Sequence, residues 1–230
     1  MGSNKTVFFI TGILVVVLGI FMTVPYGIQI IYSENNNSFL ASSIVTIFIG
    51  ILIILINLKK DNQLNLQQAF LFSVIAWVSI ALFGSLPFML SNLKLSFSDA
   101  FFESMSGITT TGSTVILDLD SSPKSILLWR AIMQWLGGIG IIVMATTVLP
   151  LLKVGGMQLF KTDSSGTEKI LPKTIEVAAT IITIYLTLTL LCAAVYWFQG
   201  MNIFDSIAHS FTTLATGGFS THNESIGYFN

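Results

Sequence analysis

The chain alternates long apolar runs with short polar segments, and five of the runs are long enough to cross a membrane. A spanning helix needs about 20 apolar residues. Each run holds at most one charged residue, and the first is too long for the apolar core of a signal peptide. We therefore predict an all-α membrane protein with five spanning helices, over residues 7–32, 39–58, 69–91, 125–152 and 174–198.

Two further segments, 96–114 and 202–221, are too polar to be full crossings. Each has an acidic residue close to its start and threonine and glycine toward its end, which is typical of a short helix followed by an irregular loop that re-enters the membrane. We expect Asp99 and Asp205 to cap the two short helices, where a carboxylate meets free backbone amides and the positive end of the helix dipole.

The two segments align without a gap at an offset of 106 positions. Each follows a spanning run, which indicates a repeated unit of helix, re-entrant loop and helix. The predicted organisation is two N-terminal helices in 1–62, a first pore repeat in 63–153, a cytoplasmic linker in 154–173 and an incomplete second repeat in 174–230. The aligned pairs are Asp99 with Asp205, Glu103 with His209, Ser104 with Ser210, Thr110 with Thr216 and Gly112 with Gly218.

Threonine- and glycine-rich loops at membrane depth favour cation permeation. Each carbonyl without a partner there costs several kcal/mol. A dehydrated cation can satisfy such carbonyls, and glycine allows the dihedral angles that turn them toward one axis. The alternative is a glycine-rich turn between packed helices, but two matched loops favour the cation site.

Composition excludes several other classes of function. The chain is 53% hydrophobic and 9% charged with a net charge of −1, so it offers no basic surface for nucleic acid, and we expect lipid as its surroundings. The single cysteine, Cys192, excludes an intrachain disulfide. No catalytic, nucleotide-binding or transition-metal motif is present, so we expect neither an enzyme nor a bound cofactor.

The distribution of lysine and arginine sets the predicted topology. With the N-terminus in the cytoplasm, seven of the ten basic residues fall on the cytoplasmic side, as the positive-inside tendency requires. The outer face is then acidic and can concentrate cations by electrostatic focusing.

Specific segments resemble a known family. Residues 99–115, DAFFESMSGITTTGSTV, resemble the first pore loop of TrkH proteins, which belong to the Trk/Ktr/HKT superfamily of potassium transporters. Residues 215–222, ATGGFSTH, resemble that family's second filter segment, and 134–140, 155–160 and 165–172 agree as well. The resemblance implies ion-binding filter positions at Thr110, Thr111, Gly112, Thr216, Gly217 and Gly218, with potassium as the substrate.

The resemblance also implies a pseudo-fourfold pore of four repeats, of which this sequence holds one and a part. We interpret the chain as an N-terminal half or fragment that needs the remaining C-terminal pore repeats. A homodimer, a bacterial inner-membrane location and a cytoplasmic nucleotide-binding regulatory subunit similar to TrkA or KtrA are further implications. That subunit would dock on segments such as 153–173.

Several charged and polar residues have more than one interpretation. Arg130 is expected to extend toward the membrane interface, with an ion pair to Glu103 or Asp118 as the alternative. His209 is interpreted as a hydrogen-bonded structural residue, although its titration beside the filter would alter cation affinity. His222 is expected in an external loop.

Glycines and prolines within the helices carry structural predictions. Three glycines in 137–140 weaken the helix there, which indicates close helix packing or, alternatively, a bend at the inner pore mouth. Pro25 and Pro87 are expected to bend or end helices.

The leading functional hypothesis is potassium uptake, symporter or channel-like, through a carbonyl-lined selectivity filter. The alternative is a non-conducting or accessory membrane subunit that packs with a full-length pore. A transporter with inverted repeats is disfavoured because both repeats start on the cytoplasmic side.

The topology makes a labelling prediction. With Cys192 replaced, single cysteines at Asn36 and Asp120 should react with an impermeant thiol reagent in intact cells, because both positions lie outside. A cysteine at Ser164 should react only after the membrane is opened. Labelling of the Ser164 position in intact cells would contradict the five-span topology.

Overall fold

A computed structural model describes residues 4–58, 66–148 and 170–229, and within these ranges the chain is helical without a strand. Five helical stretches there are long and apolar enough to cross a membrane, namely Lys5–Ile31, Ser38–Ile56, Gln67–Leu90, Lys124–Ile142 and Glu176–Phe198. The predicted all-α class with five spanning helices is therefore confirmed. The α-helices are α1 (Lys5–Phe21), α2 (Thr23–Ile31), α3 (Ser38–Ile56), α4 (Leu66–Gly84), α5 (Leu86–Leu90), α6 (Phe97–Ile108), α7 (Lys124–Val148), α8 (Ile170–Phe198) and α9 (Ile203–Leu214), followed by the short 3₁₀-helix η3 (Ser225–Phe229).

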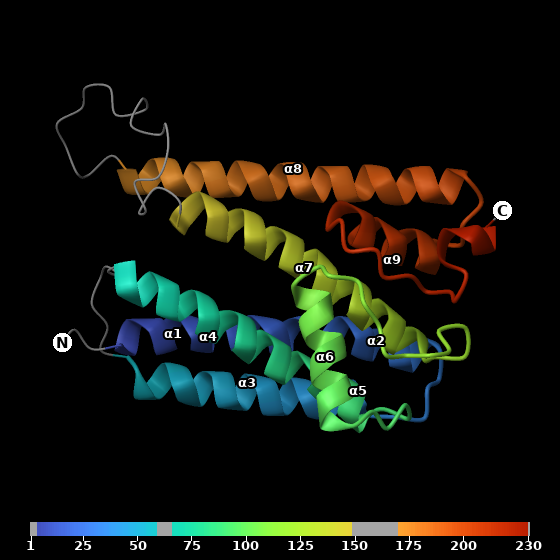
Figure 1. Ribbon diagram of the computed structural model, residues 1–230, viewed down its shortest axis with the longest axis horizontal. Helices are drawn as coiled ribbons and strands as arrows, with labels where there is room; N and C mark the ends of the chain where they lie inside the picture. The colour runs from blue at the N-terminus through green and yellow to red at the C-terminus, as the bar shows by residue number, and fades with distance from the viewer. Residues whose placement is uncertain (1–3, 59–65, 149–169, 230) are drawn as a thin grey trace.

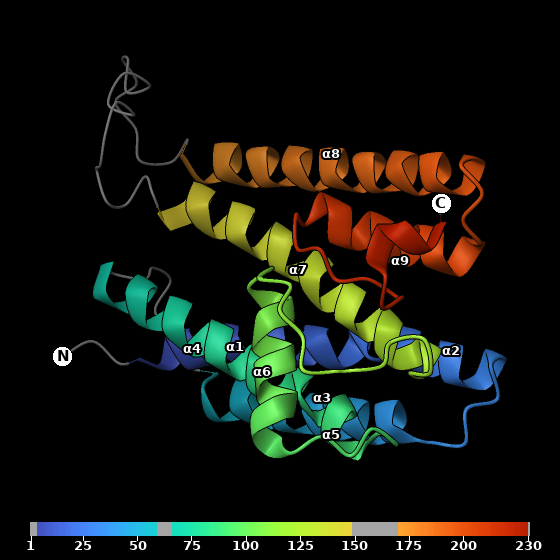
Figure 2. The ribbon, with the colours of Figure 1, turned by 45° about the vertical axis from the view of Figure 1, so that its right-hand side comes forward.

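The long helices run between the two ends of the molecule, and α6 crosses them steeply in both views (Figures 1 and 2). Helix α6 packs against α4 and α7, whereas α9 packs against α7 and α8. Helix α7 thus lies between the two short helices and contacts both.

Two of the five stretches are interrupted near their prolines. A proline lacks the backbone N–H, and its ring clashes with the carbonyl four residues before it. Helix α1 ends at Phe21, four residues before Pro25, and α4 ends at Gly84, three residues before Pro87. The prediction that both prolines bend or end a helix is confirmed.

The expected linker over 154–173 and the end of the expected run over 125–152 fall largely on residues 149–169, which lie outside the described part of the chain. Helix α8 begins at Ile170, four residues earlier than the sequence indicated. The linker and its docking role remain predictions.

The hydrophobic core lies around the first half of α7. Trp129 is fully buried, stacks edge-on against Phe39 at 6.0 Å between ring centroids, and donates its indole N–H to the Gly84 carbonyl at 3.0 Å. The Glu34 carboxylate accepts the Ser125 N–H at 3.1 Å and so satisfies a free amide in the first turn of α7. These contacts fix α7 against α3, the end of α4 and the α2–α3 connection.

Two glycines let α7 pass directly behind the C-terminal ends of α6 and α9. A Cβ atom on Gly137 would lie 2.0 Å from the Ile108 carbonyl oxygen, and one on Gly138 would lie 3.1 Å from the Ala215 Cα. A Cβ at 137 would overlap the Ile108 carbonyl, and one at 138 would require its neighbours to shift. The close-packing interpretation is confirmed for these two glycines.

This packing gives opposite expectations for neighbouring glycines. Gly137→Ala should lower the melting temperature and the amount of inserted protein, because overpacking against a backbone carbonyl costs about 1–3 kcal/mol. Gly140→Ala is the matched control, since among the described residues its Cβ would meet Trp77 alone, at 3.9 Å, and alanine adds up to about 1 kcal/mol of helix propensity. Equal melting temperatures for the two variants in detergent would contradict the packing.

Candidate functional site

Helices α6 and α9 begin with the same capping arrangement. Ser96 and Asn202 have extended backbones, with φ/ψ of −60°/161° and −65°/163°, and their side chains accept the N–H of Asp99 and Asp205. The expectation that the aspartates are the caps is wrong. An N-cap oxygen reaches the amide three residues later, so the aspartates lie in the first turn, where their charge favours the positive end of the dipole.

The C-terminal ends of the two helices are also alike. We call residues 109–115 the first loop and residues 215–221 the second loop. In each, two backbone amides fold back onto carbonyls of the last helical turn, which closes the helix end. The four bonds are Thr110 N to Gly107 O at 3.0 Å, Thr111 N to Ser106 O at 2.9 Å, Thr216 N to Thr213 O at 2.9 Å and Gly217 N to Thr212 O at 2.9 Å.

Left-handed backbone recurs at equivalent positions of both loops. Thr110 has φ of 56° and Thr216 of 54°, while Gly112 has φ of 80° and Gly218 of 77°. A β-branched residue rarely adopts positive φ, and such strain persists only where the surroundings impose it, commonly at functional sites. The 106-residue offset seen in the sequence therefore also relates the backbone dihedral angles.

The two loops meet through their backbones. A Cβ on Gly112 would lie 2.0 Å from the Gly217 carbonyl oxygen, so no side chain fits between them. The structure brings all six candidate residues together at this junction. Thr111, Thr216 and Gly218 are exposed, Thr110 and Gly112 are half-buried, and Gly217 is buried.

A buried carboxylate fixes the end of the first loop. Glu103 accepts hydrogen bonds from the Thr114 hydroxyl at 2.9 Å and the Val115 N–H at 3.0 Å, and it pairs with the Arg130 Nε at 2.7 Å. Glu103 is 0% exposed and Arg130 is 1% exposed. The expectation that Arg130 extends to the interface is wrong, and the alternative of an ion pair with Glu103 is correct. Pairing inside the protein satisfies a charge that could not be left alone there.

Arg130 also reaches the second loop. Its Nη1 donates to the Ser220 carbonyl at 2.9 Å, and its guanidinium lies 4.0 Å from the centroid of the Phe219 ring. A planar guanidinium can donate in two directions and stack on an aromatic face at once. One side chain of α7 therefore connects both loops.

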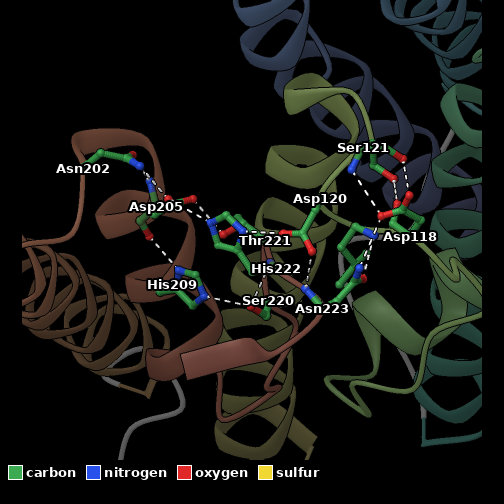
Figure 3. Close-up of polar contacts among 12 residues, drawn as sticks. Asp118, Asp120, Ser121, Asn202, Asp205, His209, Ser220, Thr221, His222 and Asn223 are labelled. Atoms are coloured by element: carbon green, nitrogen blue, oxygen red, sulfur yellow. Dashed lines mark hydrogen bonds and ion pairs between the residues drawn. The ribbon is translucent and has the colours of Figure 1, made fainter. Parts of the chain in front are cut away.

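In the second repeat, a histidine makes the contact that the Glu103 carboxylate makes in the first. His209 occupies the position equivalent to Glu103, and Ser220 the position equivalent to Thr114. The His209 Nε2 lies 3.0 Å from the Ser220 hydroxyl and its Nδ1 lies 2.9 Å from the Asp205 carbonyl oxygen (Figure 3). Both ring nitrogens are paired, so the structural interpretation of His209 is confirmed.

His222 joins α9 to the segment that precedes α7. Its ring lies between Asp205 and Asp120, at 3.2 Å and 2.6 Å (Figure 3). The ring also stacks on Tyr228 at 3.6 Å between centroids. Burial opposes ionisation of Asp205, but hydrogen bonds from Thr221, His222 and the cap of α9 outweigh it and lower the pKa of this carboxyl. His222 lies in a loop, as expected, but its side chain is buried and bridges two aspartates.

Asn223 extends this bridge at the surface. Its side chain accepts the Leu119 N–H at 2.8 Å and donates to Asp118 at 3.2 Å (Figure 3). Hydrogen bonds from Ser121 and Asn223 lower the pKa of the Asp118 carboxyl below its ordinary value. The connection from the first loop to α7 is therefore tied to the end of the second loop.

Gln134 contacts the site but was not singled out from the sequence. It is fully buried on α7, one turn after Arg130, and its Oε1 accepts the Phe219 N–H at 3.1 Å. The available signal was its spacing, because residues four apart share a helix face. Little else in the sequence marks Gln134, because its side chain is uncharged and its backbone partner lies far along the chain.

Within residues 4–58, 66–148 and 170–229, no group of three or more His, Cys, Asp or Glu side chains is arranged to hold a metal ion. The acceptors that the two loops offer at their junction are backbone carbonyls and threonine hydroxyls.

Comparison with known proteins gives consistent matches. Residues 35–230 match the TrkH family of cation transport proteins. The chain is 43% identical over 226 residues to the Trk system potassium uptake protein TrkH of Escherichia coli K12, covering 96% of this chain and 47% of that protein. It is 41% identical over 222 residues to the Trk system potassium uptake protein TrkI of Halomonas elongata, covering 96% of this chain and 45% of that protein.

The fold is also that of a solved structure. The crystal structure of the potassium transporter TrkH from Vibrio parahaemolyticus matches 100% of this chain with a TM-score of 0.89 and 39% identity, over 47% of its own length. The chain thus spans about half the length of the relatives that it matches. Since the family match extends over most of its residues and curated relatives exceed 40% identity, the chain belongs to the TrkH family of cation transport proteins.

Proposed function

We propose that this chain forms part of a potassium-uptake pore and that its two loops are two segments of the selectivity filter. The observation that carries the proposal is the repeated left-handed backbone at Thr110 and Gly112 and at Thr216 and Gly218. Left-handed backbone can turn neighbouring carbonyls toward one axis, where they replace the hydration shell of a cation. The family of uptake proteins favours potassium as that cation.

The short helices support the same function. Helices α6 and α9 end directly at the loops, so the partial negative charge of each C-terminus lies beside the ion path. That charge stabilises a cation without a fixed carboxylate that would bind it too tightly to leave. An accessory, non-conducting subunit would have no use for two strained loops, which makes that alternative the weaker one.

The remaining assignments extend this proposal. The loops re-enter the membrane from the outside, the N-terminus is cytoplasmic, and the location is the bacterial inner membrane. Because the chain spans about half of its relatives, the complete pore requires further C-terminal repeats. We also propose a homodimer and a cytoplasmic nucleotide-binding subunit similar to TrkA or KtrA, which binds the linker over 154–173.

The filter assignment predicts the effect of Gly112→Ala in a complete pore that contains this sequence. Alanine at φ of 80° is strained by about 1–2 kcal/mol and would press on the Gly217 carbonyl. Because 1.4 kcal/mol corresponds to a tenfold change and the overlap with the Gly217 carbonyl adds to the strain, potassium preference over sodium should fall by about tenfold or more. Rubidium and sodium uptake per molecule of inserted protein measures this change.

The control for Gly112 is Gly27→Ala, whose Cβ would meet nothing within 4 Å. It should leave uptake and selectivity unchanged. If Gly112→Ala reduced only the amount of inserted protein and left the rubidium-to-sodium ratio intact, Gly112 would be a packing turn and not a filter residue.

The buried ion pair predicts a non-additive pattern of stability. Arg130→Gln or Glu103→Gln alone should destabilise the protein by about 3–5 kcal/mol, because each leaves a buried charge without its partner. The double variant should lose clearly less than the sum of the two. Thermal melting in detergent measures the pattern, with Lys124→Gln on the same helix as the control. Additive losses would show that the pair is not coupled.

A further inference from the structure

The two loops differ at one filter position. Thr111 in the first loop is equivalent to Gly217 in the second. Positive φ does not account for this glycine, because the glycines with positive φ in the described part of the chain are Gly112, Gly200 and Gly218. Something other than backbone conformation must account for the missing side chain at 217.

Gln134 fills the space that a side chain at 217 would need. A Cβ on Gly217 would lie 2.3 Å from the Gln134 Cδ, 2.5 Å from its Oε1 and 2.6 Å from its Nε2. These distances are far below van der Waals contact. Gln134 belongs to α7 of the first repeat. A residue of the first repeat therefore occupies the space that a side chain at position 217 of the second repeat would need.

The two polar atoms of the Gln134 amide differ in their hydrogen bonding. The Oε1 accepts the N–H of Phe219, the residue directly after Gly218. The Nε2 is buried and has no hydrogen-bond partner within the described residues. A buried donor without an acceptor is destabilising, and a leucine of similar size would avoid it. Within the described residues, the amide therefore acts on the second loop through its carbonyl oxygen.

We propose that Gln134 is a positioning residue that sets the second filter segment and thereby contributes to ion selectivity. Its side chain packs against Gly217 in place of a side chain of the loop, and its Oε1 holds the Phe219 amide. Discrimination between potassium and sodium depends on the arrangement of filter carbonyls, so displacing this segment changes selectivity. The inference rests on the proposed filter function.

A coupling experiment tests the packing part in a complete pore that contains this sequence. The variants are Gly217→Ala, Gln134→Ala and the double variant, with Gly218→Ala and Gln134→Ala/Gly218→Ala as the matched control pair. A Cβ on Gly218 would meet nothing within 4 Å, but its φ is 77°, so its strain is conformational. Truncating Gln134 can relieve a clash at 217 but not backbone strain at 218.

Gly217→Ala should lower the rubidium-to-sodium uptake ratio at least tenfold or abolish insertion. The double variant should return to within about threefold of Gln134→Ala alone, as expected for residues in direct contact. The control pair should show no such recovery. Where Gly217→Ala fails to insert, recovery of inserted protein in the double variant is the expected result, and its absence overturns the packing.

A second variant tests the hydrogen bond. Gln134→Leu keeps the volume but removes the acceptor of the Phe219 N–H, so the protein should insert with a clearly lowered rubidium-to-sodium ratio. Met133→Leu, a buried neighbour on α7, is the volume-conserving control and should keep the ratio. An unchanged ratio in Gln134→Leu overturns the positioning role.

The same measurements separate this inference from the filter proposal. If Gly112→Ala and Gly218→Ala both leave the ratio unchanged, the two loops are not a selectivity filter. If those two variants lower the ratio while the Gln134 variants behave as their controls do, the filter stands and only the role of Gln134 is wrong.

Discussion

The arrangement of the two loops depends on the buried ion pair between Glu103 and Arg130. The carboxylate holds the end of the first loop, and the guanidinium donates onward to the second loop at Ser220. Because neither charge is stable in the interior without the other, α6, α7 and the second loop keep one mutual position. Together with the Gln134 contact to Phe219, the ion pair holds the two loops where Gly112 approaches Gly217.

The spanning helices and the repeat could be predicted because their causes are local. Uncharged runs of sufficient length mark the helices, and the prolines mark the breaks in two of them. The repeat could be predicted because aspartate, serine, threonine and glycine residues, such as Asp99 with Asp205 and Gly112 with Gly218, recur at one fixed offset. The exact caps were misassigned, since Ser96 and Asp99 both suit a helix start and only the backbone geometry distinguishes N-cap from first turn.

The contacts between repeats could not be predicted from the sequence because they join distant parts of the chain. Arg130 lies 90 residues from Ser220, and no spacing rule relates them. His222 likewise owes its burial to Asp120, 102 residues away. Gly217 resembled an ordinary flexible filter glycine, whereas the space around it is occupied by Gln134 from another helix.

The contacts that hold the two loops use side-chain atoms in some cases and backbone atoms in others, and this difference affects how homologues can vary. Within each repeat the contact joins two side chains, Glu103 with Thr114 and His209 with Ser220, so the two members of a pair should covary. Arg130 reaches the second loop through a backbone carbonyl, which every amino acid supplies. Position 220 is therefore free to change without regard to Arg130, whereas Asp120 and His222, which meet through their side chains across the two repeats, should covary.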